Sequence, residues 1–241
     1  MRPAGLDGAG QGRPALFVAT TRRQGDPRKM VEYNALATGT EGARHGEQPR
    51  IILASVSPRR KLLLEKLGVP FQVIPANVAE DEVAPEAPPE IRVERLALAK
   101  AEAVFRDHPQ SLVIGADTVV DVDGRSLGKP RDRDEAVAML RLLSGRHHWV
   151  HTGLALVGPG VRRTGHESTR VWFRPLDDRE IEAYVATGAP MDKAGAYGIQ
   201  EQAASFVSRV EGCFFSVMGL PLARLAEELR AAQAELARGA R

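Results

Sequence analysis

The chain has 241 residues, of which 43% are hydrophobic and 27% charged, with a formal net charge of +2. This length fits one large domain or two small ones, and either can bury a sizeable core. No apolar run approaches the roughly 20 residues that a membrane-spanning helix needs, and we expect no secretory signal. The single cysteine, Cys213, excludes an internal disulfide and a zinc cluster, which is typical of a cytoplasmic protein. The small net charge predicts no stable nucleic-acid partner.

The first fifty residues differ in composition from the rest of the chain. They hold seven Arg and one Lys against two Asp and three Glu, together with eight of the 23 glycines. Sustained helical or strand periodicity is missing, apart from the short run 15–18, so we predict a disordered extension over residues 1–49. A basic arm that contacts an acidic partner is one alternative, and a chain that naturally starts at Met30 is another.

From Ile51 onward, short apolar runs alternate with helical patterns. Apolar runs bounded by turn residues favour buried strands, and leucines spaced by three and four favour helices. Ser57 followed by Pro58 is typical of a helix N-cap and its first residue. Strands and helices mix throughout, which indicates an α/β fold. We predict strands at 51–55, 71–74, 112–116 continued at 119–122, 149–157, 169–173 and 206–210, helices at 59–67, 91–105, 135–143, 177–187 and 220–236, and loops at 78–89 and 188–200.

A basic segment, Ser55-Val-Ser-Pro-Arg-Arg60, lies where the first predicted strand gives way to a helix. Free amides and the helix dipole favour anions there, yet Arg59, Arg60 and Lys61 occupy the first turn, where acidic residues are the rule. Such a departure from a local rule indicates a function. A phosphate would bind both the amides and an arginine. A solvated basic start of a helix is the alternative.

Asp117 follows the apolar strand Leu112–Ile114, in the sequence Gly115-Ala-Asp-Thr118. A carboxylate at the C-terminal end of a buried strand points into the crevice where α/β proteins bind ligands. There it can hold a divalent metal or accept a proton from water. An aspartate that forms a turn by bonding its own backbone is the alternative.

Two lysines and an acidic loop add further candidates. Glu80 and Glu82 are candidates for completing a metal site with Asp117, although composition favours a solvated charge run for this loop. Lys100 lies within an apolar helix face, where it either snorkels to solvent or binds phosphate. Lys129, in a Gly-Lys-Pro loop, is a weaker phosphate-binding candidate.

The segment 190–200 carries glycines at 195 and 198, which allow the backbone to approach a ligand closely. It ends on Gln200, whose carboxamide donates and accepts hydrogen bonds at once, as recognition of a base edge requires. A purely structural loop is the alternative.

Taken together, these segments resemble the Maf family of nucleoside triphosphate pyrophosphatases. The resemblance implies a mixed twisted sheet with flanking helices and a deep central cleft, as in inosine triphosphate pyrophosphatases. We expect this domain to span residues 50–231, with a tail at 232–241. The matching motifs are Leu53-Ala-Ser-x-Ser-Pro-Arg-Arg, Gly115-Ala-Asp-Thr-Val-Val, Gly128-Lys-Pro, Leu143-Ser-Gly-Arg, Asp192-Lys-Ala-Gly-Ala-Tyr-Gly-Ile-Gln and Gly219-Leu-Pro-Leu.

The resemblance implies hydrolysis of a nucleoside triphosphate between its α and β phosphates, which yields the monophosphate and pyrophosphate. It implies that Asp117 is the proton acceptor, and that Glu80 and Asp117 hold a divalent cation, magnesium or manganese. The expected substrate- and phosphate-binding residues are Ser55, Arg59, Arg60, Lys100 and Lys129.

Three positions concern the choice of base. Arg59, Thr118 and Gln200 match the positions that separate the dTTP/UTP branch of the family from its 7-methyl-GTP branch, and this chain resembles the dTTP/UTP branch. Uracil and thymine present N3–H as a donor and O4 as an acceptor, so one carboxamide is able to pair with both. The chain departs from the family where Glu201 follows Gln200, since the family often has glycine there, and this leaves the substrate range open.

The resemblance also implies a homodimer. Three alternatives to the dTTP/UTP activity stay open: a 7-methyl-GTP-type or broader nucleotide pyrophosphatase, a phosphatase that releases orthophosphate, and a nucleotide-sensing regulator of cell division.

Overall fold

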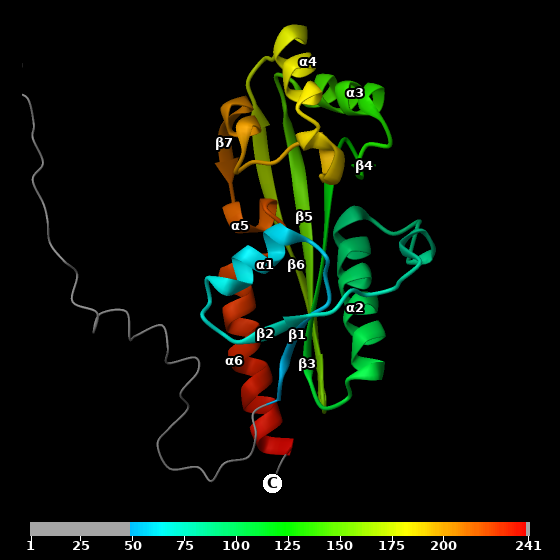
Figure 1. The fold of residues 1–241 in the computed structure, drawn as a ribbon, viewed down its shortest axis with the longest axis vertical. Helices are drawn as coiled ribbons and strands as arrows, with labels where there is room; N and C mark the ends of the chain where they lie inside the picture. Colours follow the sequence, from blue (N-terminus) through cyan, green and yellow to red (C-terminus); the bar gives the residue numbers. More distant parts are fainter. Residues whose placement is uncertain (1–48, 240–241) are drawn as a thin grey trace, which may run out of the picture. The chain divides into compact units, whose positions relative to one another are not determined.

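The computed structural model of the protein describes residues 49–239. The extension expected at residues 1–49 therefore lies outside the described residues, except for its last residue. Within the described domain, one seven-stranded sheet has the order β2-β1-β3-β5-β6-β7, and β4 pairs with the far end of β3 (Figure 1). The strands are β1 (Ile51–Leu53), β2 (Phe71–Val73), β3 (Leu112–Val122), β4 (Arg125–Leu127), β5 (His147–Gly158), β6 (Val161–Phe173) and β7 (Val207–Glu211).

The sheet is mixed, and six α-helices accompany it in residues 49–239. Strand β1 runs parallel to β2 and β3, whereas β3, β5, β6 and β7 form antiparallel pairs. The predicted α/β class, with a mixed sheet and flanking helices, is confirmed. The helices are α1 (Pro58–Glu65), α2 (Pro89–Asp107), α3 (Arg133–Leu143), α4 (Asp178–Ala186), α5 (Phe214–Val217) and α6 (Leu222–Gly239), and the short 3-10 turns are η3 (Glu80–Glu82), η4 (Ala189–Asp192), η5 (Ala194–Ala196) and η6 (Gln202–Phe206).

Helices α2 and α6 lie on opposite faces of the sheet (Figure 1). Alternate residues of β3 point to opposite faces, as the two-residue period of a strand requires. Val113 packs in the apolar cluster of α2, whereas Ile114 packs in the cluster that α1 and α6 form. Helices α3 and α4 cover a third cluster, built around the second half of β3 and the start of β5.

Helix α2 lies directly on the backbone of the sheet because two strand residues on that face are glycines. A Cβ atom at Gly115 would lie 2.0 Å from the carbonyl oxygen of Ala97, and one at Gly153 would lie 2.1 Å from that of Val93. No side chain fits at either position. This close packing fixes the height and the register of α2 over β3 and β5.

The structure corrects two expectations. Asp117 lies in the middle of β3 and not at the end of a strand, because the two predicted apolar runs form one continuous strand. Strand β6 begins at Val161, since its first half is polar and half-exposed and lacks a clear apolar signal. The domain expected at residues 50–231 and the tail expected at 232–241 stay predictions; helix α6 continues across the boundary between them and buries Ala232.

Sequence patterns did not predict six short elements, β4, α5 and the four 3-10 turns η3 to η6, which are each five residues or fewer. Among residues 49–239, no helix is both long and apolar enough to cross a membrane.

Candidate active site

A cleft of about 580 Å³ lies where β3 continues beyond the end of β1. Strand β1 ends at Leu53, opposite Ile114, so the second half of β3 forms a wall of this cleft. All nine site residues predicted from the sequence line it, whereas Glu82 does not: Ser55, Arg59, Arg60, Glu80, Lys100, Asp117, Thr118, Lys129 and Gln200. A second hollow of about 730 Å³, beside α2 and the β5–β6 turn, contains none of the nine.

Lys100 brings the two predicted metal-binding carboxylates together. Its Nζ atom lies 2.6 Å from Oδ1 of Asp117 and 2.7 Å from Oε1 of Glu80, and the residue is only 9% exposed. Burial opposes ionisation of Glu80, but the hydrogen bond and charge of Lys100, with the charges of Lys129 and Arg60, lower its pKa below the ordinary value. Of the two alternatives for Lys100, the structure shows the inward-pointing one.

The start of α1 has the N-cap serine and the first-turn proline that the sequence predicted. Ser57 caps the helix by accepting a hydrogen bond from the amide of Arg60, Pro58 is its first residue, and no acidic residue lies in its first turn. The Oγ atom of Ser55 accepts a hydrogen bond from the amide of Ser57 at 3.1 Å. The uncompensated positive end of the helix therefore faces the cleft.

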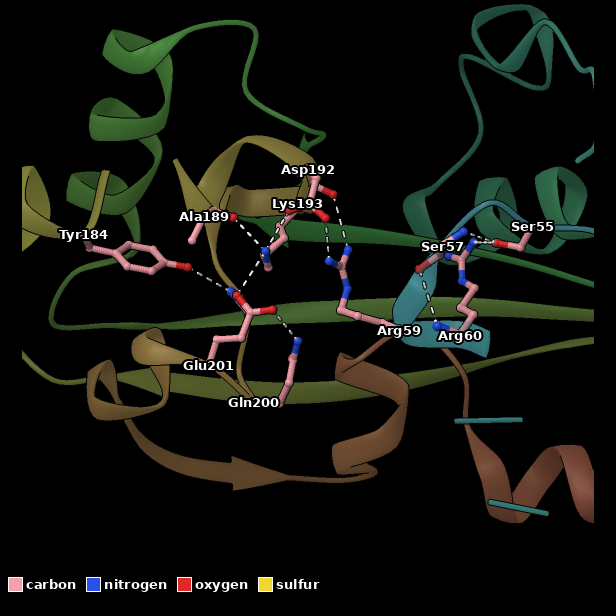
Figure 2. Close-up of polar contacts among 11 residues, drawn as sticks. Ser55, Ser57, Arg59, Arg60, Tyr184, Ala189, Asp192, Lys193, Gln200 and Glu201 are labelled. Carbon is pink, nitrogen blue, oxygen red and sulfur yellow. Dashed lines mark hydrogen bonds and ion pairs between the residues drawn. The ribbon is translucent and has the colours of Figure 1, made fainter. Parts of the chain in front are cut away.

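The two adjacent arginines of α1 have different partners, as Figure 2 shows. The guanidinium of Arg60 turns inward and donates to the carbonyl of Gly219 at 2.8 Å, to Thr118 Oγ1 at 3.0 Å and to Ser55 Oγ at 3.4 Å. Burial lowers the pKa of Arg60, and the charge of Asp117 opposes this shift. Its three fixed contacts hold this cation against the wall of the cleft.

Arg59 crosses to the segment after α4 instead. It donates to the Oδ2 atom of Asp192 at 2.8 Å and to the carbonyl of the same residue at 3.3 Å. Burial opposes ionisation of Asp192, but its hydrogen bonds to Lys193 and Arg59 lower its pKa. Arg59 thus ties the first helix to the segment that carries Gln200.

Sequence reasoning did not single out Asp192 and Lys193, although both belong to a motif that it used. The ammonium of Lys193 is 6% exposed and lies 2.7 Å from Oδ1 of Asp192 and 3.1 Å from Oε2 of Glu201. The nearby glycines gave a signal, since Gly198 makes room for the lysine side chain. The nine predicted residues are brought together, and their individual roles stay predictions.

The side chains of Glu80 and Asp117 have the chemistry to bind a divalent cation whose other ligands come from a phosphate group. Both carboxylates reach one ammonium, so they converge on a single point. Within residues 49–239, no group of three or more His, Cys, Asp or Glu side chains is arranged to hold a metal ion without help. Magnesium is commonly bound by one or two carboxylates together with substrate phosphates, and this pair has that composition.

The fold and the cleft define an α/β protein with a highly charged cleft. Six cationic side chains, four carboxylates and a helix N-terminus line the cleft, a combination suited to phosphate groups and a cation.

The comparisons with known proteins identify the family. Residues 50–232 match the model of the Maf-like protein family, and the chain belongs to this family. A relative from Pelotomaculum thermopropionicum, named dTTP/UTP pyrophosphatase, is 52% identical over 182 residues, which cover 75% of this chain and 95% of the relative. Relatives of the same name from Bacillus cytotoxicus and Symbiobacterium thermophilum are 51% and 52% identical, over 75% of this chain and 94% and 92% of their own lengths. The solved Ham1 protein of Staphylococcus aureus aligns with a TM-score of 0.34 and 16% identity, over 52% of this chain and 71% of its own.

Proposed function

We propose that this chain is a hydrolase that converts nucleoside triphosphates to the monophosphate and pyrophosphate, with dTTP and UTP as its substrates. The observation that carries the proposal is the Asp117–Lys100 pair, 2.6 Å apart, in a cleft lined by Arg60, Lys129 and the N-terminus of α1. The names of relatives that are about half identical in sequence supply the substrate class.

The proposed reaction is attack of water on the α phosphorus, which breaks the α–β anhydride bond and releases pyrophosphate. Asp117 accepts the proton of the attacking water. Its Oδ1 atom is bonded to Lys100, so Oδ2 is the oxygen available for that proton. A divalent cation held by Glu80 and Asp117 would polarise the phosphate and neutralise part of its charge.

The cationic side chains bind the triphosphate, which carries roughly four negative charges near neutral pH. Arg60 and Lys129 both line the cleft. Because Arg60 has three hydrogen bonds to the protein, its charge is already oriented before substrate binds. Preorganised charge of this kind costs no reorganisation during the reaction.

Gln200 reads the base in this proposal. Its carboxamide is able to accept from N3–H and donate to O4 of uracil or thymine, whereas cytosine presents the opposite pair. The residue lines the same cleft as Asp117, so one bound nucleotide is expected to contact both. We further propose that the enzyme is a cytoplasmic homodimer that uses magnesium or manganese, as the family resemblance implies.

A panel of nucleotides tests the proposal directly. The full chain is incubated with UTP, dTTP, CTP, GTP, ATP and 7-methyl-GTP, with magnesium or manganese, and both pyrophosphate and orthophosphate are measured. We expect pyrophosphate, with the highest kcat/KM for UTP and dTTP. Release of orthophosphate, a preference for 7-methyl-GTP, or nucleotide binding without turnover would each contradict it.

A further inference from the structure

Arg59 is the first of four charged side chains of alternating sign that lead in a series of contacts to the amide of Gln200 (Figure 2). Arg59 Nη1 lies 2.8 Å from Oδ2 of Asp192, whose Oδ1 lies 2.7 Å from Nζ of Lys193. Lys193 Nζ in turn lies 3.1 Å from Oε2 of Glu201. The other carboxylate oxygen of Glu201 accepts a hydrogen bond from Nε2 of Gln200 at 3.0 Å.

Lys193 is the fixed centre of this series. It is 6% exposed, and its ammonium also donates to the carbonyl of Ala189 at 2.7 Å. The ammonium therefore donates hydrogen bonds to one backbone carbonyl and to Asp192, and it forms an ion pair with Glu201. A buried cation held by these three contacts has little freedom to move, so it holds Glu201 in place.

Gly198 is the residue that makes the contact between Lys193 and Glu201 possible. A Cβ atom there would lie 2.6 Å from Cε of Lys193 and 3.3 Å from Cδ of Glu201. The amide of Gly198 donates to the hydroxyl of Tyr184 at 3.3 Å, which anchors this turn to α4. The position of Glu201 is therefore set by the packing of the segment as well as by its charge.

The chemistry of Glu201 decides which end of the Gln200 carboxamide faces it. An ionised carboxylate only accepts hydrogen bonds, so the NH2 group of Gln200 must point toward it and the carbonyl oxygen must point away. We propose that Glu201 is a positioning residue for base selection: it orients the Gln200 carboxamide so that its carbonyl oxygen meets the N3–H of uracil or thymine. This inference rests on the proposed function.

This arrangement discriminates against cytosine by orientation. The N3 atom of cytosine carries no proton. It and the carbonyl oxygen of Gln200 are both acceptors, so no hydrogen bond forms between them. A free glutamine amide would rotate by half a turn and offer its NH2 group to that N3. The bond to Glu201 opposes this rotation. Arg59 contacts the same series through Asp192 and Lys193. Arg59 therefore affects the choice of base through these residues, without contacting the base itself.

The test compares Glu201→Ala with Gln202→Ala, a change at a neighbouring exposed residue whose side chain forms no hydrogen bond with Gln200. We measure kcat/KM for UTP and CTP, and we expect the UTP-to-CTP ratio to fall about 3- to 10-fold in Glu201→Ala and to stay unchanged in Gln202→Ala. Loss of one negative charge near the triphosphate acts on both nucleotides alike, so the ratio isolates the effect on the base. If CTP turnover is too slow, the ratio of inhibition constants for UMP and CMP replaces it.

A double-mutant cycle shows whether Glu201 acts through Gln200. In a Gln200→Ala background, the further change Glu201→Ala is expected to leave the UTP-to-CTP ratio unchanged. Thermal melting of each variant separates this effect from loss of folding, and Glu201→Gln replaces the alanine variant if that one unfolds. An unchanged ratio in the single variant, or an equal change with and without Gln200, would overturn the inference. A parent chain that releases no pyrophosphate from UTP or dTTP would contradict the proposed function instead.

Discussion

The Nζ atom of Lys100 lies 2.6 Å from the Oδ1 atom of Asp117, although the two residues belong to a helix and to a strand. The close approach of α2 to β3 explains this contact. Gly115, two residues before Asp117, leaves no atom between the strand and the carbonyl of Ala97, so the next turn of the helix brings Lys100 over the strand. A charge-assisted hydrogen bond of this length orients the carboxylate toward the cleft.

Asp117→Asn is expected to lower kcat for UTP at least ~100-fold, because an amide cannot accept the proton of the attacking water and binds a cation poorly. The measurement is the rate of pyrophosphate release. The matched control is Asp121→Asn, four residues further along β3 on the same face, which lies outside the cleft. Activity of Asp117→Asn within a few-fold of the parent would remove this residue from the mechanism.

Gly115→Ala is expected to destabilise the domain and to lower activity together. The new methyl group would overlap the carbonyl oxygen of Ala97, so α2 must shift and carry Lys100 away from Asp117. We expect a loss of about 1–3 kcal/mol or more in the free energy of unfolding, measured by urea denaturation. Gly128→Ala is the control for stability, since a Cβ atom there would meet no other atom within 4 Å and its backbone needs no positive φ. Equal free energies of unfolding for the two variants would contradict this packing argument.

Local patterns were enough to predict most of the secondary structure. The Ser57-Pro58 start of α1 and the apolar spacing of α2 agree with the structure to within two residues. The prediction that Asp117 lies at the end of a strand was wrong, because a pattern of apolar runs does not show that β3 continues past its neighbour β1. The length of a strand beside a shorter partner depends on tertiary pairing, which local sequence does not encode.

The candidate site was predictable as a set of residues, but its contacts were not. Motif resemblance brought nine residues into one set, and the structure places them in one cleft. The pairing of Arg59 with Asp192 joins residues that are 133 positions apart in the chain. Such a contact follows from how α1 and the segment after α4 meet in space. Sequence reasoning noted Glu201 as a departure from the family but had no means to find its contacts.

His148 is expected to make the domain less stable in mild acid. It is almost fully buried, and burial, with the charges of His147 and Arg146, lowers its pKa from 6.5 to about 3. Between these two values the unfolded chain binds one proton more than the folded chain, so lowering the pH favours unfolding. Between pH 7 and pH 5 this residue alone is expected to remove about 2 kcal/mol from the free energy of unfolding.

The matched variant for this prediction is His148→Gln, which does not titrate and keeps a polar group near the hydroxyl of Tyr197, now 2.7 Å from His148 Nε2. Urea denaturation at pH 7, 6 and 5 gives the free energy of unfolding of both proteins. The variant is expected to be less stable than the parent at pH 7. Its free energy of unfolding is expected to fall less than that of the parent between pH 7 and pH 5. Parallel pH profiles would show that His148 is not the source of the effect.

Thr118 is expected to act through Arg60 and not by donating a hydrogen bond to the base. The hydroxyl of Thr152 donates its single proton to the carbonyl of Ser216 at 2.8 Å, so Thr118 must donate its own proton to Thr152 Oγ1, 3.0 Å away. The remaining contact of the Thr118 hydroxyl is the hydrogen bond that it accepts from Arg60 Nη2 at 3.0 Å.

Thr118→Val keeps the shape of the side chain but leaves Arg60 without one of its three partners. We expect a cost of about 1–3 kcal/mol in the free energy of unfolding, and a fall of roughly 10-fold in kcat/KM that is equal for UTP, dTTP and CTP, because a displaced Arg60 binds every triphosphate less well. Thr118→Ser retains the hydroxyl and is expected to behave like the parent. If Thr118→Val instead changes the UTP-to-CTP ratio while the activity on UTP is maintained, the residue contacts the base directly and this argument is wrong.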